Sequence, residues 1–174
     1  MISSPSPHLM TDPMYSSLRT LAHDRDLAAA LGDMVIAWAY AEEALLGAIT
    51  RILGSRLNLV QAGYYGMPTI NARIQFAQGL ITEWDCPREF DKDTISFEID
   101  KLGKLASAPN HWIHGNWCST KDRSETVIFD HRSHRDSSKR RKPIKSADVN
   151  NHTVAVLAKA DALSGLIDWE SLPL

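Results

Sequence analysis

Residues 24–54 read DRDLAAALGDMVIAWAYAEEALLGAITRILG, and this stretch decides the fold. Its apolar side chains recur at steps of three and four residues, the period of one face of an α-helix. They are Leu27, Leu31, Met34 or Val35, Trp38, Leu45, Ile49 and Ile52. We predict an amphipathic helix of about 28 residues that ends at Gly54 and turns Glu42 and Glu43 toward solvent. The many alanines favour a helical backbone and would let a partner helix pack closely.

Three later segments show the same helical period. The first is 70–81, directly after Pro68, and the second runs from about residue 88 to residue 116. The third is 146–167, with Ser146 as its predicted N-cap. Together with the first helix these segments predict a bundle in which each helix buries one apolar face.

Pro109 lies inside the second of these segments. Proline has no amide hydrogen to donate to Leu105, and its ring crowds the preceding turn. We therefore predict that the helix kinks or breaks near residues 105–108.

The period changes to that of strands after Asn116. Residues 117–120 and 126–129 flank a short polar turn, which predicts a small hairpin. The predicted fold is all-α, a bundle of four to five helices with one β-hairpin inserted before the last helix. We expect one domain over 24–174, preceded by a mobile tail over 1–23.

The composition excludes several classes of protein. The chain has 174 residues, of which 44% are hydrophobic and 23% charged, so it is neither a disordered chain nor a membrane protein. Its two cysteines, Cys86 and Cys118, are too few for a disulfide framework. We expect a cytoplasmic protein without a membrane anchor.

The charge is distributed unevenly along the chain. Residues 131–145 contain seven lysines or arginines and one acid, a net charge of +6, which leaves −8 for the rest because the whole chain carries −2. We predict that this basic segment is an exposed loop that contacts RNA phosphates. The predicted contacts are Arg132, Arg135, Lys139, Arg140, Arg141 and Lys142. A solvated loop without a ligand is the alternative.

Residues 104–115, KLASAPNHWIHG, contain the candidate site. Asn110 and His114 are four residues apart and so share one face of a helix. Gly115 would end that helix or let a second backbone approach the imidazole of His114. The imidazole of a histidine can give or take a proton near neutral pH, so His114 is the candidate acid or base.

This segment and the order of helices around it resemble HEPN domains, small helical bundles that usually dimerise. Many HEPN domains are metal-independent endoribonucleases of toxin–antitoxin or antiviral systems, and their motif often has the form Arg-Asn-x-x-x-His-Gly. Asn110, His114 and Gly115 match this motif, and the likeness covers about residues 24–169. The resemblance implies a homodimer that binds RNA, with His114 catalytic and Asn110 orienting it, and with a cognate antitoxin or regulatory protein as partner.

Pro109 stands where the family has its arginine. The resemblance implies that the arginine and the histidine face the scissile phosphate, so this chain lacks the motif cation. Three explanations remain open: a non-catalytic family member, a substitution that silences a toxic nuclease, or replacement by another arginine such as Arg73 or Arg51. The alternative function is a non-catalytic helical dimer that binds a protein or nucleic-acid partner.

Two His-x-x-His pairs, His111 with His114 and His131 with His134, could in principle supply the four imidazoles of a zinc site. The second pair lies among arginines, which disfavour a bound cation. We expect no metal and no other cofactor.

Overall fold

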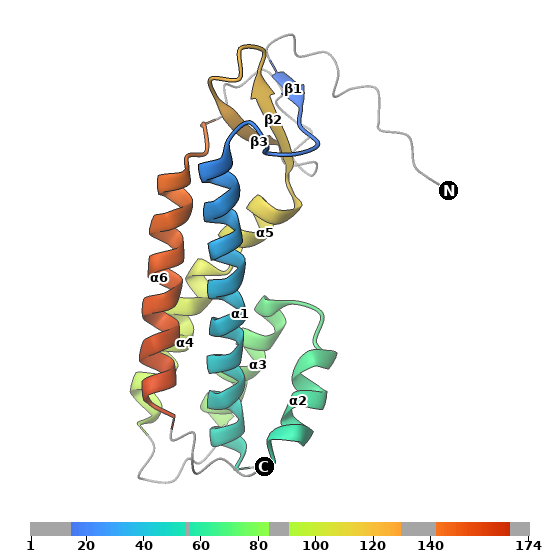
Figure 1. Cartoon of the computed structure of the whole chain (residues 1–174). Helices are drawn as coiled ribbons and strands as arrows, with labels where there is room; N and C mark the ends of the chain where they lie inside the picture. Colours follow the sequence, from blue (N-terminus) through green and yellow to red (C-terminus); the bar gives the residue numbers. More distant parts are fainter. Residues whose placement is uncertain (1–14, 55, 84–90, 130–141, 168–174) are drawn as a thin grey trace, which may run out of the picture.

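The computed structural model describes residues 15–54, 56–83, 91–129 and 142–167. They form β1 (Tyr15–Ser17), α1 (Arg25–Leu53), α2 (Leu57–Gly66), α3 (Ile70–Glu83), α4 (Lys92–Leu105), α5 (Ser107–His114), β2 (Asn116–Thr120), β3 (Thr126–Phe129) and α6 (Ser146–Gly165). Helices α1 and α6 lie side by side and start at the same end, where the small sheet is located (Figure 1). The predicted helical bundle with a hairpin before the last helix is confirmed.

The predicted first helix is confirmed at both ends. The Asp24 side chain caps α1 by accepting a hydrogen bond of 3.0 Å from the Leu27 amide. Gly54 ends the helix in the left-handed conformation, with φ of 56°, which glycine adopts with little strain. Small side chains cover much of its buried face and permit the close approach of α6. They are Ala30, Ala37, Ala41, Ala44 and Ala48.

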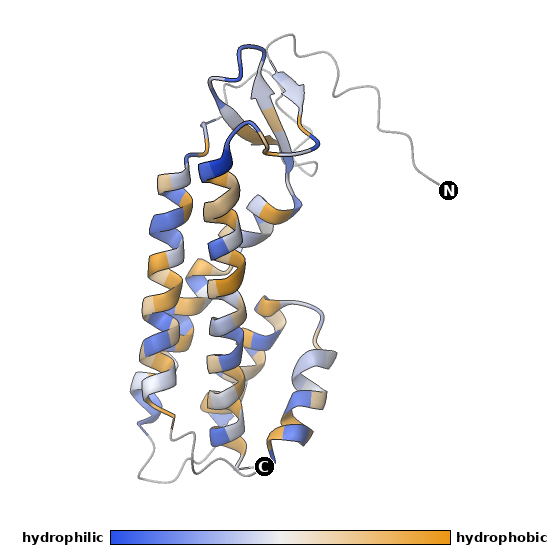
Figure 2. Cartoon of the chain, in the orientation of Figure 1, coloured by the Kyte–Doolittle hydropathy of each residue, from blue (hydrophilic) through white to orange (hydrophobic). Residues whose placement is uncertain are grey.

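The core lies between α1, α4 and α6. It includes Leu27, Met34, Leu45 and Ile49 of α1, Ile95, Ile99 and Leu102 of α4, and Val149, Val156 and Leu163 of α6. Hydrophobic residues line much of α1, whereas the turn between β2 and β3 is hydrophilic (Figure 2). Burial of these side chains supplies the main stabilisation of the bundle.

Two elements were not predicted. Helix α2 follows α1, and β1 pairs antiparallel with β2, so that the sheet order is β1-β2-β3. Residues 15–23 therefore belong partly to the folded domain and not to a tail, because Ser16 pairs with Ser119. Residues 1–14, the rest of the predicted tail, lie outside the described ranges.

The start of the last helix also differs from the prediction. Lys145, and not Ser146, is the N-cap of α6, and its amide donates to Asp148 Oδ2 at 3.2 Å. Ser146 is the first residue of the helix. The carboxylate of the first turn thus caps the helix in place of the predicted hydroxyl.

Candidate functional site

The helix that carries the candidate motif breaks where Pro109 predicts it. Helix α4 ends at Leu105 and α5 begins at Ser107, with Ala106 between them. Pro109 is the third residue of α5, where an amide hydrogen has no partner within the helix, and its side chain is buried. The proline is thus accommodated by starting a new helix in front of it.

His111 and His114 lie in the last turn of α5, and both side chains are exposed. Asn110 lies in α5, but its side chain is outside the described part of the structure. Both imidazoles are therefore accessible to a ligand from solvent.

Gly115 is the C-cap of α5, and the packing around it leaves no room for a side chain. Its φ of −76° is open to any residue, and its amide donates to His111 O at 3.0 Å. A β-carbon at this position would overlap Ile128 Cγ2 and lie 2.5 Å from His111 O. Gly115 thus ends the helix, one of the two outcomes that the sequence predicted, and the group that approaches it closely from outside the helix is the Ile128 side chain of β3.

Trp112 anchors α5 to the bundle. Its carbonyl accepts a hydrogen bond of 2.9 Å from Trp117 Nε1, and its ring meets the His152 ring edge-on at 5.0 Å. His152 also stacks against Trp38, whose Nε1 donates to His152 Nε2 at 3.4 Å. Sequence reasoning missed His152, although it lies three residues after Val149 on the core-facing side of α6.

The burial of His152 predicts a pH dependence of stability. Burial lowers the pKa of His152 below its usual value of about 6.5. The unfolded chain therefore binds this proton more readily, and the free energy of unfolding falls as pH drops below about 6.5. We expect His152→Gln to lose less thermal stability than the wild type between pH 7.5 and 5.5. His111→Gln, at an exposed site, should keep the wild-type response, and an equal response of both variants would contradict this assignment.

Arg73 holds α1, α2 and α3 together. Its Nη1 pairs with Glu42 Oε2 at 2.7 Å, and its Nε and Nη2 donate to the carbonyls of Tyr64 and Met67, each at 3.2 Å. The guanidinium also lies 4.8 Å from the centre of the Tyr64 ring. Glu42 is therefore an ion-pair partner, which corrects the expectation of a solvated carboxylate, whereas Glu43 is exposed as expected.

These contacts bear on the missing motif cation. Each nitrogen of the Arg73 guanidinium has a partner on α1 or α2, which argues against its use at α5. Arg51 lies in the last turn of α1, at the end of that helix opposite the sheet, whereas α5 leads into β2 (Figure 1). The contacts of Arg73 give no support to the expectation that it takes the place of a motif arginine.

Removal of the Arg73 side chain should destabilise the protein. The side chain is only 14% exposed, so Arg73→Ala leaves Glu42 and the Met67 carbonyl without this donor, while the Tyr64 carbonyl keeps the Met67 amide. We expect a loss of about 2–3 kcal/mol in the free energy of unfolding, measured by urea denaturation. Arg56→Ala, at an exposed position before α2, should change it by less than about 0.5 kcal/mol. Equal effects of the two substitutions would show that the Arg73 contacts do not stabilise the fold.

Most of the residues predicted to contact RNA phosphates lie outside the described residues. This applies to Arg132, Arg135, Lys139, Arg140 and Arg141, and also to His131 and His134. Lys142 is described, and its side chain is exposed. Within the described ranges, no group of three or more His, Cys, Asp or Glu side chains could hold a metal ion.

Two further observations concern the class of protein. Cys118 of β2 is a free, half-buried cysteine, and burial raises the pKa of its thiol, which disfavours the reactive thiolate. In the part of the chain that the structure describes, no helix has both the length and the apolar character needed to cross a membrane. Cys86 lies outside these residues.

No family model, no curated protein and no solved structure matches the chain. The resemblance to HEPN domains stays a prediction from the sequence.

Proposed function

We propose that this chain is a HEPN-like, metal-independent endoribonuclease of a toxin–antitoxin or antiviral type, held inactive by Pro109. The observation that carries the proposal is the exposed His114 in the last turn of α5, immediately before Gly115. An exposed imidazole at this position can exchange a proton with an RNA strand that approaches from solvent.

The chemistry needs two groups. His114 acts as acid or base while the RNA 2′-hydroxyl attacks the adjacent phosphorus, and the products carry a cyclic phosphate and a free 5′-hydroxyl. A cation must stabilise the negative charge that develops on the phosphate. Pro109 occupies the position of that cation and is buried. We therefore propose that this chain still binds RNA but does not cleave it.

The proposed protein is a cytoplasmic homodimer. Its support is a strip of exposed apolar side chains on α1 that includes Val35 and Ile36, the latter 70% exposed. Ile113, next to His114, is 49% exposed. Large exposed apolar side chains are found at protein interfaces. A cognate antitoxin or regulatory protein would be a further partner.

A second candidate function is a non-catalytic helical dimer that binds a protein or nucleic acid. The engagement of Arg73 by Glu42 favours it, because it leaves the motif without a substitute from that side chain. The two candidate functions use the same dimer interface, and they differ only in whether the protein can cleave RNA.

Cleavage of bulk tRNA and mRNA in the presence of a chelator tests the proposal. The protein is compared with Pro109→Arg, and with Pro109→Arg combined with His114→Ala. Cleavage by Pro109→Arg alone, with cyclic-phosphate ends, supports the endoribonuclease. If none of the three cuts RNA, the non-catalytic dimer is the better conclusion.

A further inference from the structure

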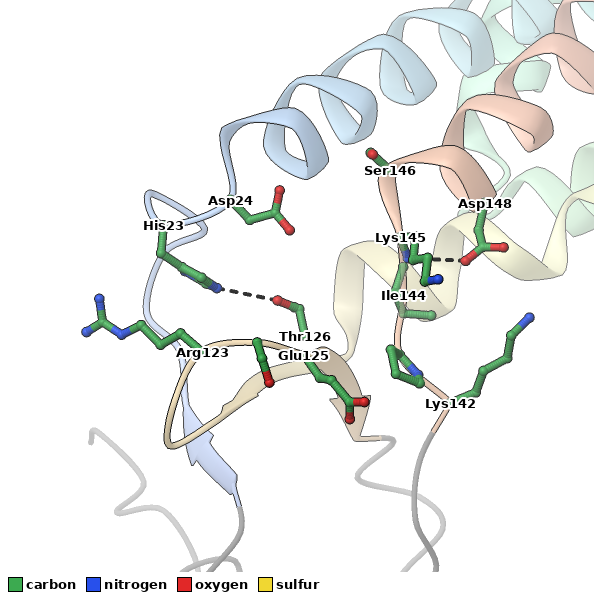
Figure 3. A pocket seen from close by; sticks show the side chains of 12 residues that line it. His23, Asp24, Arg123, Glu125, Thr126, Lys142, Ile144, Lys145, Ser146 and Asp148 are labelled. Atoms are coloured by element: carbon green, nitrogen blue, oxygen red, sulfur yellow. Dashed lines mark hydrogen bonds between the residues drawn. The ribbon is translucent and has the colours of Figure 1, made fainter.

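A cleft of about 790 Å³ lies at the end of the bundle, away from α5. The turn between β2 and β3 forms one side, and the segment that leads into α6 forms the other (Figure 3). Asp24, which caps α1, lies beside it. The Ile144 amide donates to Thr126 O at 2.8 Å, and His23 Nε2 lies 3.4 Å from Thr126 Oγ1. The segment before α6 and the segment before α1 are therefore each joined to Thr126, the first residue of β3.

Three cations line this cleft. Arg123 comes from the hairpin turn, and Lys142 and Lys145 come from the opposite side (Figure 3). Among the described residues, the recorded ion pairs join Arg73 to Glu42 and Lys159 to Glu98. The three cations of the cleft thus have no carboxylate partner within ion-pair distance in those residues.

The cleft also has three carboxylates, and two of them serve the helix ends. Asp24 Oδ1 accepts from the Leu27 amide at 3.0 Å, and Asp148 Oδ2 accepts from the Lys145 amide at 3.2 Å. Glu125 is the third and is half-buried. Asp24 and Asp148 keep their negative charge, but each directs an oxygen to a backbone amide, whereas the three cations are engaged in no ion pair within the described residues.

The backbone of Arg123 indicates that its side chain has a role. Arg123 has φ of 57°, in the left-handed region where glycine or asparagine is less strained. Asp122 fixes this turn, because its Oδ1 accepts from Thr120 Oγ1 at 2.5 Å and from the Ser124 amide at 3.1 Å. These bonds lower the pKa of Asp122 to about 2. An arginine at this strained position lies next to the cleft, and a function of its guanidinium would account for the strain.

We propose that this cleft binds the phosphodiester backbone of single-stranded RNA through Arg123, Lys142 and Lys145. The inference rests on the proposed function and names where the strand is held. The described residues that line the cleft include no Phe, Tyr or Trp, so they offer phosphate contacts without base stacking.

The cleft lies at a distance from the candidate catalytic histidine. Thr126 pairs with Ser119, five residues along the chain from His114. At about 3.3 Å per strand residue, this places the cleft roughly 15 Å from α5. The cleft should therefore affect RNA affinity and leave the chemistry at His114 unchanged.

The salt dependence of RNA binding tests the cleft. The probe is a fluorescent 20-nucleotide oligouridine, and its affinity is measured between 50 and 200 mM salt. Loss of three phosphate contacts should lower the slope of log K against log salt by about 2, at roughly 0.7 for each contact. The affinity of the wild type falls over this fourfold rise in salt. For the variant Arg123→Gln/Lys142→Gln/Lys145→Gln, the factor by which affinity falls should be roughly fifteen-fold smaller.

The control carries the same change in net charge at a distance from the cleft. Arg56→Gln/Lys92→Gln/Lys101→Gln replaces cations on or next to α2 and α4, outside the candidate site, and should keep the wild-type slope. Equal slopes for the two triple variants would contradict the proposal that the cleft binds RNA phosphates. If the wild type binds no RNA, both the proposed function and the cleft proposal fail. If the wild type binds RNA but the cleft variant binds it equally well, only the cleft proposal fails.

Arg123→Gly separates binding from stability. Glycine fits the left-handed backbone, so the variant should melt no lower than the wild type and yet bind the oligouridine more weakly, with a slope lower by about 0.7. Unchanged affinity and slope in a folded Arg123→Gly variant would contradict a contact between this side chain and phosphate.

Discussion

Replacement of Pro109 by arginine is expected to raise RNA cleavage by about 10²–10³-fold, the usual effect of one group that stabilises charge in a transition state. Position 109 is in the first turn of α5, and His114 is in the last turn of the same eight-residue helix. A cation there would complete the charge arrangement that the HEPN-like motif requires. The measurement is the initial rate of formation of cyclic-phosphate ends on bulk tRNA with a chelator present.

The matched control is Pro109→Ala. Alanine removes the proline ring and restores an amide hydrogen, so it changes the helix without adding charge. We expect Pro109→Ala to stay inactive, and His114→Ala to remove the gain from Pro109→Arg. If Pro109→Ala cleaves as fast as Pro109→Arg, the break between α4 and α5, and not the missing cation, is what holds the activity low.

The elements that sequence reasoning predicted are those with strong local signals. Helix α1 has a long apolar period, an Asp24 cap and a terminal Gly54, and each of these acts within one turn. The break at Ala106 follows from Pro109 alone, since a missing amide hydrogen has a local effect. Such signals need no knowledge of the neighbouring helices.

The missed elements depend on contacts that are distant in sequence. Strand β1 has three residues, of sequence YSS, and forms because β2 offers a free edge about 100 residues later in the chain. Helix α2 buries few side chains, including Val60 and Tyr64, and its anchor is Arg73 of α3. Neither element has an apolar period strong enough to predict it.

The candidate site divides in the same way. The spacing of Asn110 and His114 predicted that both lie in one helix, and both lie in α5. The contact of Trp112 with His152 joins residues that are 40 positions apart, and spacing within one segment gives no sign of it. Asn110 and its orienting role stay a prediction, because its side chain lies outside the described residues.

The last prediction concerns Gly115, where α5 meets the sheet. In Gly115→Ala the new β-carbon would overlap Ile128 Cγ2 and lie 2.5 Å from His111 O, so either the end of α5 or β3 must move. Because Ile128 is buried and His111 O is backbone, neither can yield easily. We expect the free energy of unfolding to fall by about 1–3 kcal/mol, measured by denaturant titration.

Gly79→Ala gives the opposite expectation with the same chemical change. Gly79 lies within α3, and no atom would contact a β-carbon there within 4 Å. Alanine is the better helix former, so this variant should gain about 0.5–1 kcal/mol. A Gly115→Ala protein as stable as Gly79→Ala would show that Ile128 can retreat from α5. A loss confined to Gly115→Ala would instead show that the close packing of Gly115 against Ile128 stabilises the junction between α5, which carries His111 and His114, and the sheet.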